Sequence, residues 1–313
     1  MFTPDETHFE IIDAALDAGL HVMATKPIVK TLEKHLFLVK KAADKNLLLQ
    51  IEVHKRFDPI YNDAVMRICS LGEFNFFTSY MSQPKFQLET FKAWAGIQSD
   101  ISYYLNSHHI DLHVWAMQKI GAKCLEVTGI ASKGVVAEKM ECLNDGRDCE
   151  DTITLTALWE NSSGSKGHAT YTASWTAANS DVHSQQRFFC LMEKGEVNVD
   201  QCHRGYTVAT DETQGLSSLN PLYIRNVPDV HTGEYIGQNG YGYVSFEKFV
   251  KAATEINQGK VKAIELNDGR LPTGATTTLV TAILEAGRKS LDNGGVKVQL
   301  GYGVEGNVEK VFI

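Results

Sequence analysis

The sequence lacks the features that mark several protein classes. It has no run of Lys or Arg that could follow a phosphate backbone or an anionic bilayer, and its net charge is -8. No stretch approaches the roughly 18 consecutive apolar residues of a membrane span. The first residues also lack the basic and then apolar pattern of a signal peptide. These absences argue against nucleic acid or membrane as partners and favour a cytoplasmic protein.

Cysteine and histidine spacing predicts neither a disulfide framework nor a metal site. The six cysteines form no C-x-x-C pair and are widely scattered, so we expect reduced thiols. His109 and His113 are four residues apart on one predicted helical face, near His108 and Asp111. A zincin motif would need Glu at position 110, which is Ile110 here. A metal-dependent hydrolase therefore remains only a minor alternative.

The first 55 residues alternate helical and strand patterns. Apolar residues at helical spacing predict a helix over 5–18, and 21–25 reads as a strand buried on both faces. Pro27 cannot continue a central strand, so this strand ends at Lys26. A second helix and a second apolar strand, 47–53, follow. The order is typical of half a doubly wound (Rossmann) parallel sheet, and we predict the carboxyl-terminal half of a dinucleotide-binding domain over 1–55.

From residue 56 onward the pattern changes. β-Branched and aromatic residues alternate over 152–159, 169–175 and 187–192, which predicts a largely antiparallel sheet. The predicted helices are 59–70, 108–119, 241–256 and 273–291. We expect 56–313 to form an α+β domain for substrate binding and oligomerisation. The fold class is therefore α/β, a partial Rossmann sheet followed by an α+β domain.

One glycine-rich motif is rejected as a nucleotide-binding loop. Residues 301–306 (GYGVEG) match G-x-G-x-x-G, but only seven residues follow them. No helix could then point its amino end at a pyrophosphate, so we interpret the segment as a glycine-rich turn.

Lys26 is the first candidate for chemistry. Ligands of open parallel sheets collect beyond the carboxyl ends of the strands, where this lysine is expected. A desolvated ammonium there could orient a substrate hydroxyl, stabilise an alkoxide or move a proton. The alternative is a solvated lysine at a strand end.

The residues around Lys26 also carry a family resemblance. The relevant segments are Thr3-Pro4, His8, Ala14-Ala15-Leu16, Ala18-Gly19, His21-Val22 and Lys26-Pro27. Together they resemble the Gfo/Idh/MocA oxidoreductase family, which typically has Glu-Lys-Pro at this strand end. Here Thr25 replaces the Glu. The resemblance implies that Lys26 lies beside the nicotinamide of NADP or NAD and the reacting carbon. The residues it places at the cofactor are Thr3, Pro4, His8, Lys26, Pro27 and Arg56.

A second match lies at 101–112 (ISYYLNSHHIDL) and resembles the family's Asp-x-Gly-x-His-x-x-Asp at a helix start. With Asp111 in the last position, His108 takes the place of the catalytic histidine and Tyr104 that of the first Asp. The implied role of His108 is proton transfer, which suits a side chain with a pKa near ~6.5. A histidine that only forms structural hydrogen bonds is the alternative. Expected substrate contacts are Lys85, Trp94, Tyr103, Tyr104 and His109.

The segment 54–59 (HKRFDP) resembles the strand end that leads into the family's second domain. Lys55 and Arg56 could meet a cofactor phosphate or a substrate carboxylate, with which a guanidinium pairs through two hydrogen bonds. They could equally be surface charges.

The resemblance implies hydride transfer between NADP or NAD and a sugar, sugar acid or polyol. Residues 81–85 and 103–109 most resemble fungal D-galacturonate reductases. The first strand and glycine-rich turn of the nucleotide fold are absent, so we expect an amino-terminally truncated enzyme. A catalytically inactive sugar-sensing or regulatory protein of the same fold is the alternative. An open sheet face would suit a homodimer, as in the family.

Overall fold

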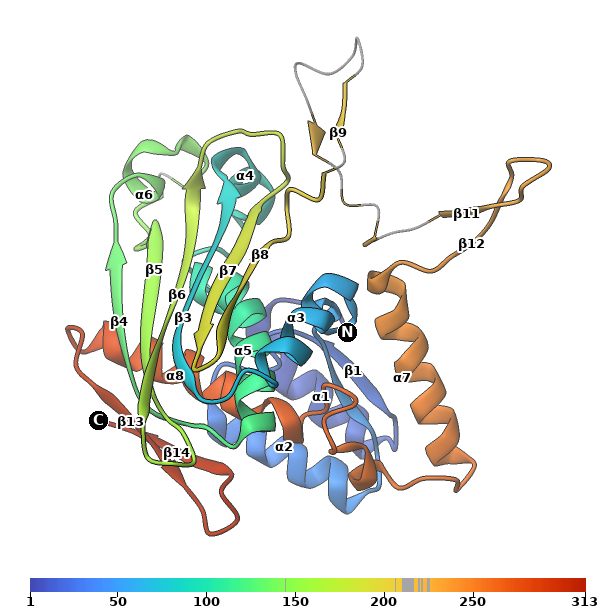
Figure 1. The fold of residues 1–313 in the computed structure, drawn as a ribbon. Helices are drawn as coiled ribbons and strands as arrows, with labels where there is room; N and C mark the ends of the chain where they lie inside the picture. The colour runs from blue at the N-terminus through green and yellow to red at the C-terminus, as the bar shows by residue number, and fades with distance from the viewer. Residues whose placement is uncertain (144, 206, 210–216, 219, 221, 224–225) are drawn as a thin grey trace.

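The structure is a computed structural model that describes residues 1–313 except 144, 206, 210–216, 219, 221 and 224–225. A small parallel unit at the amino end packs beside a large sheet covered by helices on one face (Figure 1).

The first unit is built from buried strands and amphipathic helices. In chain order its elements are η1 (Asp5–Thr7), α1 (His8–Asp17), β1 (Val22–Thr25), α2 (Leu32–Asp44) and β2 (Leu49–Glu52). The two strands are parallel, with Val22 opposite Leu49 and Thr25 opposite Glu52. Ile12 and Leu38 carry the apolar faces of α1 and α2 into the same core. The predicted Rossmann-type half-sheet is therefore confirmed.

The second unit is organised around an eight-stranded sheet. Its order is β14 (Val308–Phe312), β13 (Val298–Tyr302), β4 (Lys123–Ser132), β5 (Thr152–Glu160), β6 (Lys166–Ala177), β3 (Phe74–Pro84), β7 (Gln185–Met192) and β8 (Gly195–Asp200). All neighbours in this order are antiparallel except β3 and β6. That pair is parallel because the chain crosses from β3 to β4 through α5 and then returns through β5. The largely antiparallel sheet is thus confirmed.

The longer helices of this unit are α3 (Pro59–Ile68), α5 (Ser107–Ile120), α7 (Tyr241–Asn257) and α8 (Thr278–Asp292), and they correspond to the four helices predicted for this domain. The shorter ones are η2 (His54–Phe57), η3 (Lys85–Gln87), α4 (Leu88–Phe91), η4 (Ser102–Asn106), α6 (Val136–Lys139), η5 (Glu141–Leu143), η6 (Ala263–Leu266) and η7 (Ala275–Thr277). Helices α3, α5 and α8 cover one face of the sheet, whereas α7 packs against η2 and Leu48 of the first unit. Helix α8 begins at Thr278 rather than Thr273, because η7 takes up the intervening turn. Short strand pairs join β9 (Thr207–Val208) to β10 (Ser217–Ser218) and β11 (Asn226–Pro228) to β12 (Tyr235–Gln238).

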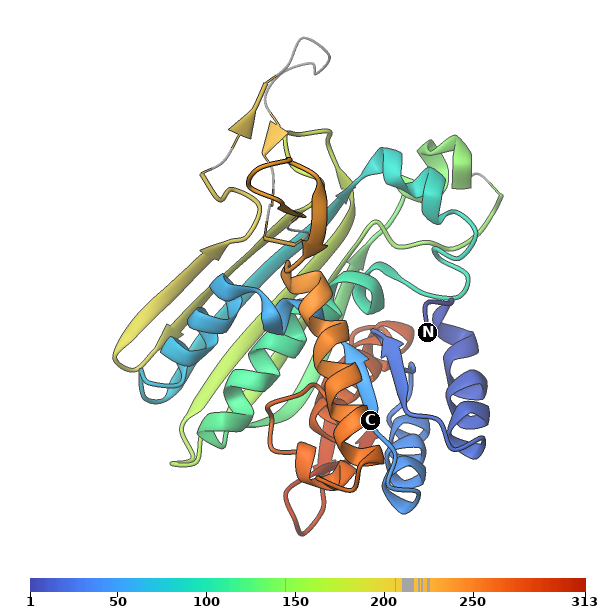
Figure 2. The ribbon, with the colours of Figure 1, turned by 90° about the vertical axis from the view of Figure 1, so that its right-hand side faces the viewer.

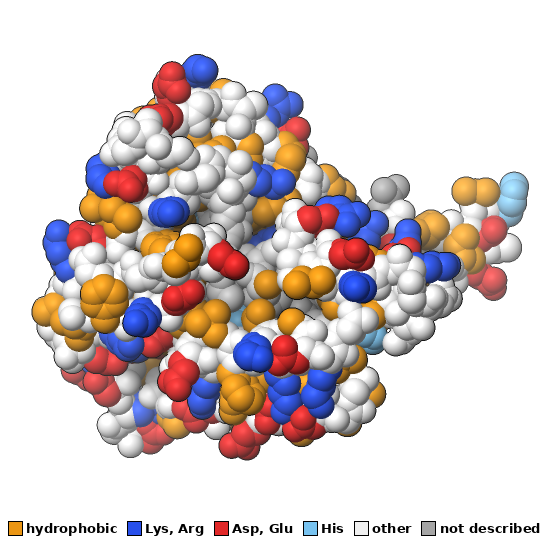
Figure 3. All heavy atoms as spheres, turned by 90° about the horizontal axis from the view of Figure 1, so that it is seen from below, with side chains coloured by type: hydrophobic (Ala, Val, Ile, Leu, Met, Phe, Trp, Pro, Cys, Tyr) orange, Lys and Arg blue, Asp and Glu red, His pale blue; other side chains and the backbone are white. Residues whose placement is uncertain are grey.

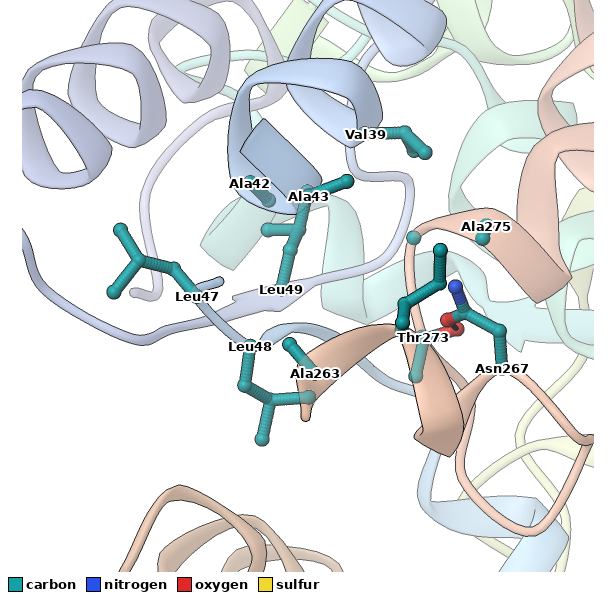
Figure 4. A pocket seen from close by; sticks show the side chains of 12 residues that line it. Val39, Ala42, Ala43, Leu47, Leu48, Leu49, Ala263, Asn267, Thr273 and Ala275 are labelled. Carbon is teal, nitrogen blue, oxygen red and sulfur yellow. Dashed lines mark hydrogen bonds between the residues drawn. The ribbon is translucent and has the colours of Figure 1, made fainter. Parts of the chain in front are cut away.

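The carboxyl-terminal part of the chain returns to the first unit. The Ile51 amide donates to the Pro272 carbonyl at 2.8 Å, and the Gly274 amide donates to the Leu49 carbonyl at 2.8 Å. Residues 272–274 thus cover the edge of β2, and Figure 2 shows α7 beside the same strands. A crevice of about 40 Å³ lies between α2, β2 and this segment, and Figure 4 shows the side chains that line it. No charged side chain lines it, so we interpret it as a packing crevice.

The glycine-rich segment near the carboxyl end lies in a hairpin. Strands β13 and β14 pair antiparallel, and Gly306 in the turn between them has a φ of +80°, which favours glycine. The interpretation of 301–306 as a turn rather than a nucleotide-binding loop is confirmed.

The surface is mixed in charge. On the face seen in Figure 3, basic and acidic side chains are interspersed. Among the described helices, none combines the length and the apolar character needed to cross a bilayer.

Candidate active site

Lys26 follows β1 at the boundary between the two units, and a buried histidine fixes the backbone around it. The His8 ring has Nδ1 at 2.9 Å from the Pro27 carbonyl oxygen and Nε2 at 2.8 Å from that of Thr3. The ring is fully buried. One imidazole therefore holds the Thr3 and Pro27 segments together and sets where Lys26 leaves the strand.

The Lys26 ammonium points toward the second unit. Its Nζ donates to the backbone carbonyl of Tyr104 and lies 4.2 Å from the centroid of the Tyr104 ring. Burial lowers the pKa of Lys26 to about 8, against the opposing effect of the Asp5 and Glu52 carboxylates. At neutral pH the group is still mainly a cation, yet it can give up its proton far more easily than a surface lysine.

Tyr104 lies in an unusual turn that precedes α5. Residues Ser102–Asn106 form a π-helix, a conformation that is rare and frequent at functional sites. The wider turn presents Tyr104 to Lys26, and His108 follows one turn later in α5. The Tyr104 ring stacks on Trp175 of β6 at a centroid distance of 5.5 Å, which fixes it from the other side.

A cavity of about 500 Å³ opens beside this turn. Its lining comes from η2, β3, η4, α5 and the segment between Val182 and Tyr241. The titratable side chains that line it are His54, Lys55, Tyr104, His108, His183, Cys202, Tyr223 and Tyr241. No Asp or Glu of the described residues lines it, so every side chain there that could carry charge near neutral pH is a base.

His108 is nearly buried at one wall of the cavity. Its exposed fraction is 8%, and among the described residues its Nδ1 has no hydrogen-bond partner. Burial lowers the pKa of His108 well below the usual value, and nearby Lys26 and Lys55 act in the same direction. The imidazole is therefore neutral at pH 7 and has a nitrogen free to meet a ligand.

A second histidine faces the first. The rings of His54 and His108 lie edge to face with centroids 5.5 Å apart. The Glu52 carboxylate orients His54, with Oε1 at 3.0 Å from Nδ1. Tyr223 and Tyr241 pack on the other sides of the His54 ring at 5.3 and 5.9 Å. His54 is therefore fixed by a hydrogen bond and by aromatic packing on several sides.

Lys55 also lines the cavity. Its side chain is 4% exposed, and its Nζ donates to Oε1 of Gln186. Burial lowers the pKa of Lys55 to about 7, although Asp58 partly opposes this effect. The structure thus brings two lysines of lowered pKa, Lys26 and Lys55, to adjacent strand ends.

Several other candidates from the sequence lie outside the cavity. Arg56 forms a buried pair with Asp111, with Nε to Oδ2 at 2.8 Å and Nη2 to Oδ1 at 2.6 Å. Its guanidinium is therefore occupied in the core rather than presented to a phosphate. His109 bonds through Nε2 to the Tyr61 hydroxyl at 2.8 Å, and the Tyr103 hydroxyl donates to the Lys30 carbonyl at 3.0 Å.

The helical turn explains why neighbours in sequence separate in space. One residue of a helix rotates the side chain by about 100°, so His109 and Tyr103 point away from the cavity that His108 and Tyr104 line. Lys85 and Trp94 are likewise absent from its lining. Trp94 packs against Phe91 and the outer side of Tyr104. Of the expected substrate contacts, only Tyr104 lines this cavity.

Sequence reasoning missed His54, Gln83, Gln186, Tyr223 and Tyr241. His54 follows a parallel strand just as Lys26 does, and that position could have drawn attention to it. Gln83 and Gln186 come from β3 and β7, Tyr223 comes from the segment before α7, and Tyr241 is the first residue of α7. Of these four, Gln83 falls in a segment with a resemblance, 81–85, but that resemblance did not single it out.

The histidine-rich start of α5 has structural partners. His113 Nδ1 lies 2.6 Å from the Tyr171 hydroxyl, and its ring stacks on Phe77 at 4.3 Å. Across the described ranges, no group of three or more His, Cys, Asp or Glu side chains is placed to hold a metal ion.

Comparison with known proteins places the amino-terminal segment. Residues 1–53 match the Gfo/Idh/MocA model, described as an oxidoreductase family with an NAD-binding Rossmann fold. The NADP-dependent scyllo-inositol 2-dehydrogenase IolW of Bacillus subtilis is 31% identical over 125 residues, which is 37% of this chain and 34% of that protein. An uncharacterised oxidoreductase of Schizosaccharomyces pombe is 33% identical over 113 residues, 34% of this chain and 30% of that protein. The matched stretch thus spans about a third of these curated relatives.

Solved structures match over nearly the whole chain. GenD2 from gentamicin A biosynthesis, solved with NAD, has a TM-score of 0.66 at 18% identity, covering 96% of this chain and 77% of that one. An inositol dehydrogenase homologue of Azotobacter vinelandii, solved with NAD+, has a TM-score of 0.67 at 21% identity, covering 95% and 76%. At such low identity these matches establish the fold.

Proposed function

Because residues 1–53 form a domain of the Gfo/Idh/MocA oxidoreductase family, we propose that this chain is part of a nicotinamide-dependent oxidoreductase. It interconverts a CH–OH group and a carbonyl on a sugar, a sugar acid or a polyol. The observation that carries the proposal is the contact between Lys26 and Tyr104. It brings the end of a nucleotide-fold strand to the cavity that His108 lines.

The residues present fit the nicotinamide end of the cofactor. Lys26 is a cation of lowered pKa at the strand end, and His108 Nδ1 lacks a partner among the described residues. By contrast, the described part of the chain contains no parallel strand, glycine-rich turn and helix that could bind the pyrophosphate. When bound, NADP or NAD would supply or accept the hydride. Pro27 directly follows Lys26, and the His8 ring ties the Pro27 backbone to that of Thr3, next to Pro4.

The protein's own part is to hold the substrate oxygen and move its proton. In reduction, the Lys26 ammonium would donate a proton to the substrate oxygen, and in oxidation the same lysine, deprotonated, would take that proton back, as microscopic reversibility requires. The low pKa of His108 disfavours the imidazole as the donor at neutral pH, so its neutral ring would accept a hydrogen bond from a substrate hydroxyl and orient it. We therefore propose for Lys26 the acid and base roles that the resemblance assigned to His108.

Within this substrate class, D-galacturonate is the first compound to test. Support comes from the resemblance of residues 81–85 and 103–109 to fungal D-galacturonate reductases. Gln83 and Tyr104 from these segments both line the cavity.

The test is oxidation of NADPH or NADH, followed by absorbance, with D-galacturonate, aldoses and inosose as substrates. We would assay the 313-residue chain and a form extended at its amino end by a strand, glycine-rich turn and helix of the Rossmann type. Turnover that disappears in Lys26→Met and falls strongly in His108→Gln supports the proposal. Sugar binding without turnover in both forms would instead favour a sugar-sensing protein.

We also propose that the open face of the large sheet binds a second copy. Residues on this face include Thr154 and Thr172, whose hydroxyls bond at 2.9 Å, and the exposed Thr156. The alternate residues Ile153 and Leu155 are buried under the helices. Sedimentation should show a dimer that Thr156→Arg weakens. A monomer at all concentrations would contradict it.

The cysteines agree with a reducing compartment. All six are free thiols, and four of them are buried. We propose the cytoplasm as the location, which fractionation of the source cells would test.

A further inference from the structure

The cavity beside His108 has an unbalanced charge. Lys55 is 4% exposed and bonds only to the neutral side-chain amide of Gln186 among the described residues. It has no ion pair there, and a buried cation without a counter-charge is costly, which is why the pKa of Lys55 falls to about 7. An anionic ligand would supply the missing counter-charge and favour the protonated ammonium.

The nearest acid is already engaged elsewhere. Asp58 is fully buried, pairs with the Arg204 guanidinium, and accepts a hydrogen bond from the Ile60 amide at 2.9 Å as the cap of α3. Its charge is therefore balanced by Arg204. Glu52, at the end of β2, accepts from His54. Neither carboxylate lines the cavity.

The same cavity presents polar atoms that the protein leaves unpaired. Among the described residues, Gln83 Oε1 and His108 Nδ1 have no hydrogen-bond partner, and both side chains are more than nine-tenths buried. Both line the cavity. Buried polar atoms normally find partners, so these two indicate a ligand with hydroxyl groups.

We propose that Lys55 binds the carboxylate of an anionic sugar, so that this cavity selects sugar acids over neutral sugars and polyols. The proposal rests on the proposed function and names the substrate group that its site recognises. Lys55 supplies a charged donor at one side, while Gln83 and His108 meet hydroxyl groups. Gln186 holds the Lys55 side chain in place until the carboxylate arrives.

The experiment compares two sugars that differ in one group. D-Galacturonate and D-galactose share their ring stereochemistry, but the first carries a carboxylate where the second has a hydroxymethyl group. Each is titrated calorimetrically into the 313-residue chain, without cofactor and with oxidised NADP or NAD, so that no reduction takes place. A hydrogen bond between charged groups predicts a preference for galacturonate of about tenfold or more.

Three variants assign that preference to Lys55. Lys55→Met keeps the length of the side chain and should remove the preference, while Lys55→Arg keeps the charge and should retain part of it. Lys119→Met removes an exposed lysine of α5 as the matched control and should change nothing. Melting curves and circular dichroism establish that each variant is folded.

The outcomes separate this inference from the proposed function. Equal affinity for both sugars, no binding of either, or a preference that survives in Lys55→Met overturns the carboxylate site. Selective binding of galacturonate that depends on Lys55 supports the site even if no hydride transfer is found, in which case only the proposed function fails. If the protein transfers hydride to neutral sugars and shows no preference for sugar acids, the proposed function stands and the carboxylate site fails.

Discussion

The two parallel strands of the first unit end side by side, yet their lysines meet different partners. Lys26 follows β1 and contacts the backbone and ring of Tyr104, with two carboxylates raising its pKa against burial. Lys55 follows β2 and meets a neutral amide in an acid-free cavity. The difference indicates a division of labour, in which Lys26 serves the reacting oxygen and Lys55 serves the rest of the substrate.

The strongest test of this division is the Lys26→Met substitution in whichever form, the 313-residue chain or its amino-terminally extended form, shows turnover. We expect turnover to fall by about 10²- to 10⁴-fold, the range for loss of a positioned acid or base. Galacturonate affinity should change little. Lys55→Met should show the opposite pattern, with the larger effect on KM. Steady-state kinetics of both variants provide the check, and equal losses of kcat in the two would refute the division.

Arg56, the neighbour of Lys55, should affect stability rather than substrate. Its pair with Asp111 has side chains exposed by only 3% and 1%. Removing one member leaves a buried charge, so Asp111→Ala should lower the free energy of unfolding by about 3–5 kcal/mol. Urea denaturation measures this, with Asp63→Ala, whose pair with Arg67 is exposed, as control. A loss below about 1 kcal/mol would contradict a buried, structural role.

The two lysines should also differ in how stability depends on pH. Burial holds the pKa of Lys55 at about 7 and that of Lys26 at about 8, against 10.5 for the ordinary group. The folded state binds fewer protons than the unfolded state above these values, so stability should rise with pH up to about 10. The charged side chains around Lys55 are Asp58, Lys26 and Arg204, and the Cys202 thiol beside it stays neutral because burial raises its pKa to about 11.

Replacing Lys55 or Lys26 by Met removes the contribution of that lysine to the pH dependence of stability. The free energy of unfolding should depend less on pH in Lys55→Met than in Lys26→Met. Lys55 contributes to the slope from about pH 7 to 10, whereas Lys26 contributes only from about pH 8. A slope that neither variant changes would show that the lysines are solvated and titrate normally.

The fold was largely predictable from local patterns. The strand before Pro27 and the helices of the second unit could be predicted from the spacing of apolar residues and from the positions of proline and glycine. These signals all lie close together in the sequence. The return of residues 272–274 to the edge of β2 could not be foreseen, because it depends on two backbone hydrogen bonds across more than two hundred residues.

The site was predictable only where a motif or a strand end marked it. Lys26 and His108 were found through the family pattern; His108 lines the cavity, and Lys26 contacts Tyr104, which lines it too. Lys85, Trp94, Tyr103 and His109 were chosen by residue type alone, and the π-helix and α5 turn two of them away from the cavity. Gln83 and Gln186 reach it from neighbouring strands of the sheet, β3 and β7, a proximity that no local sequence pattern reports.

The smallest expected effect concerns the acids that act on Lys26. Asp5 and Glu52 both raise its pKa, and Asp5 has the larger influence. Replacing either by its amide removes an anion that favours the ammonium, so the pKa of Lys26 should fall below about 8. In the reducing direction, activity needs the protonated lysine, and the alkaline limb of the pH–rate profile should move to lower pH. The shift should be larger in Asp5→Asn than in Glu52→Gln. If the alkaline limb stays in place in both variants, or moves in Lys55→Met instead, Lys26 is not the proton donor.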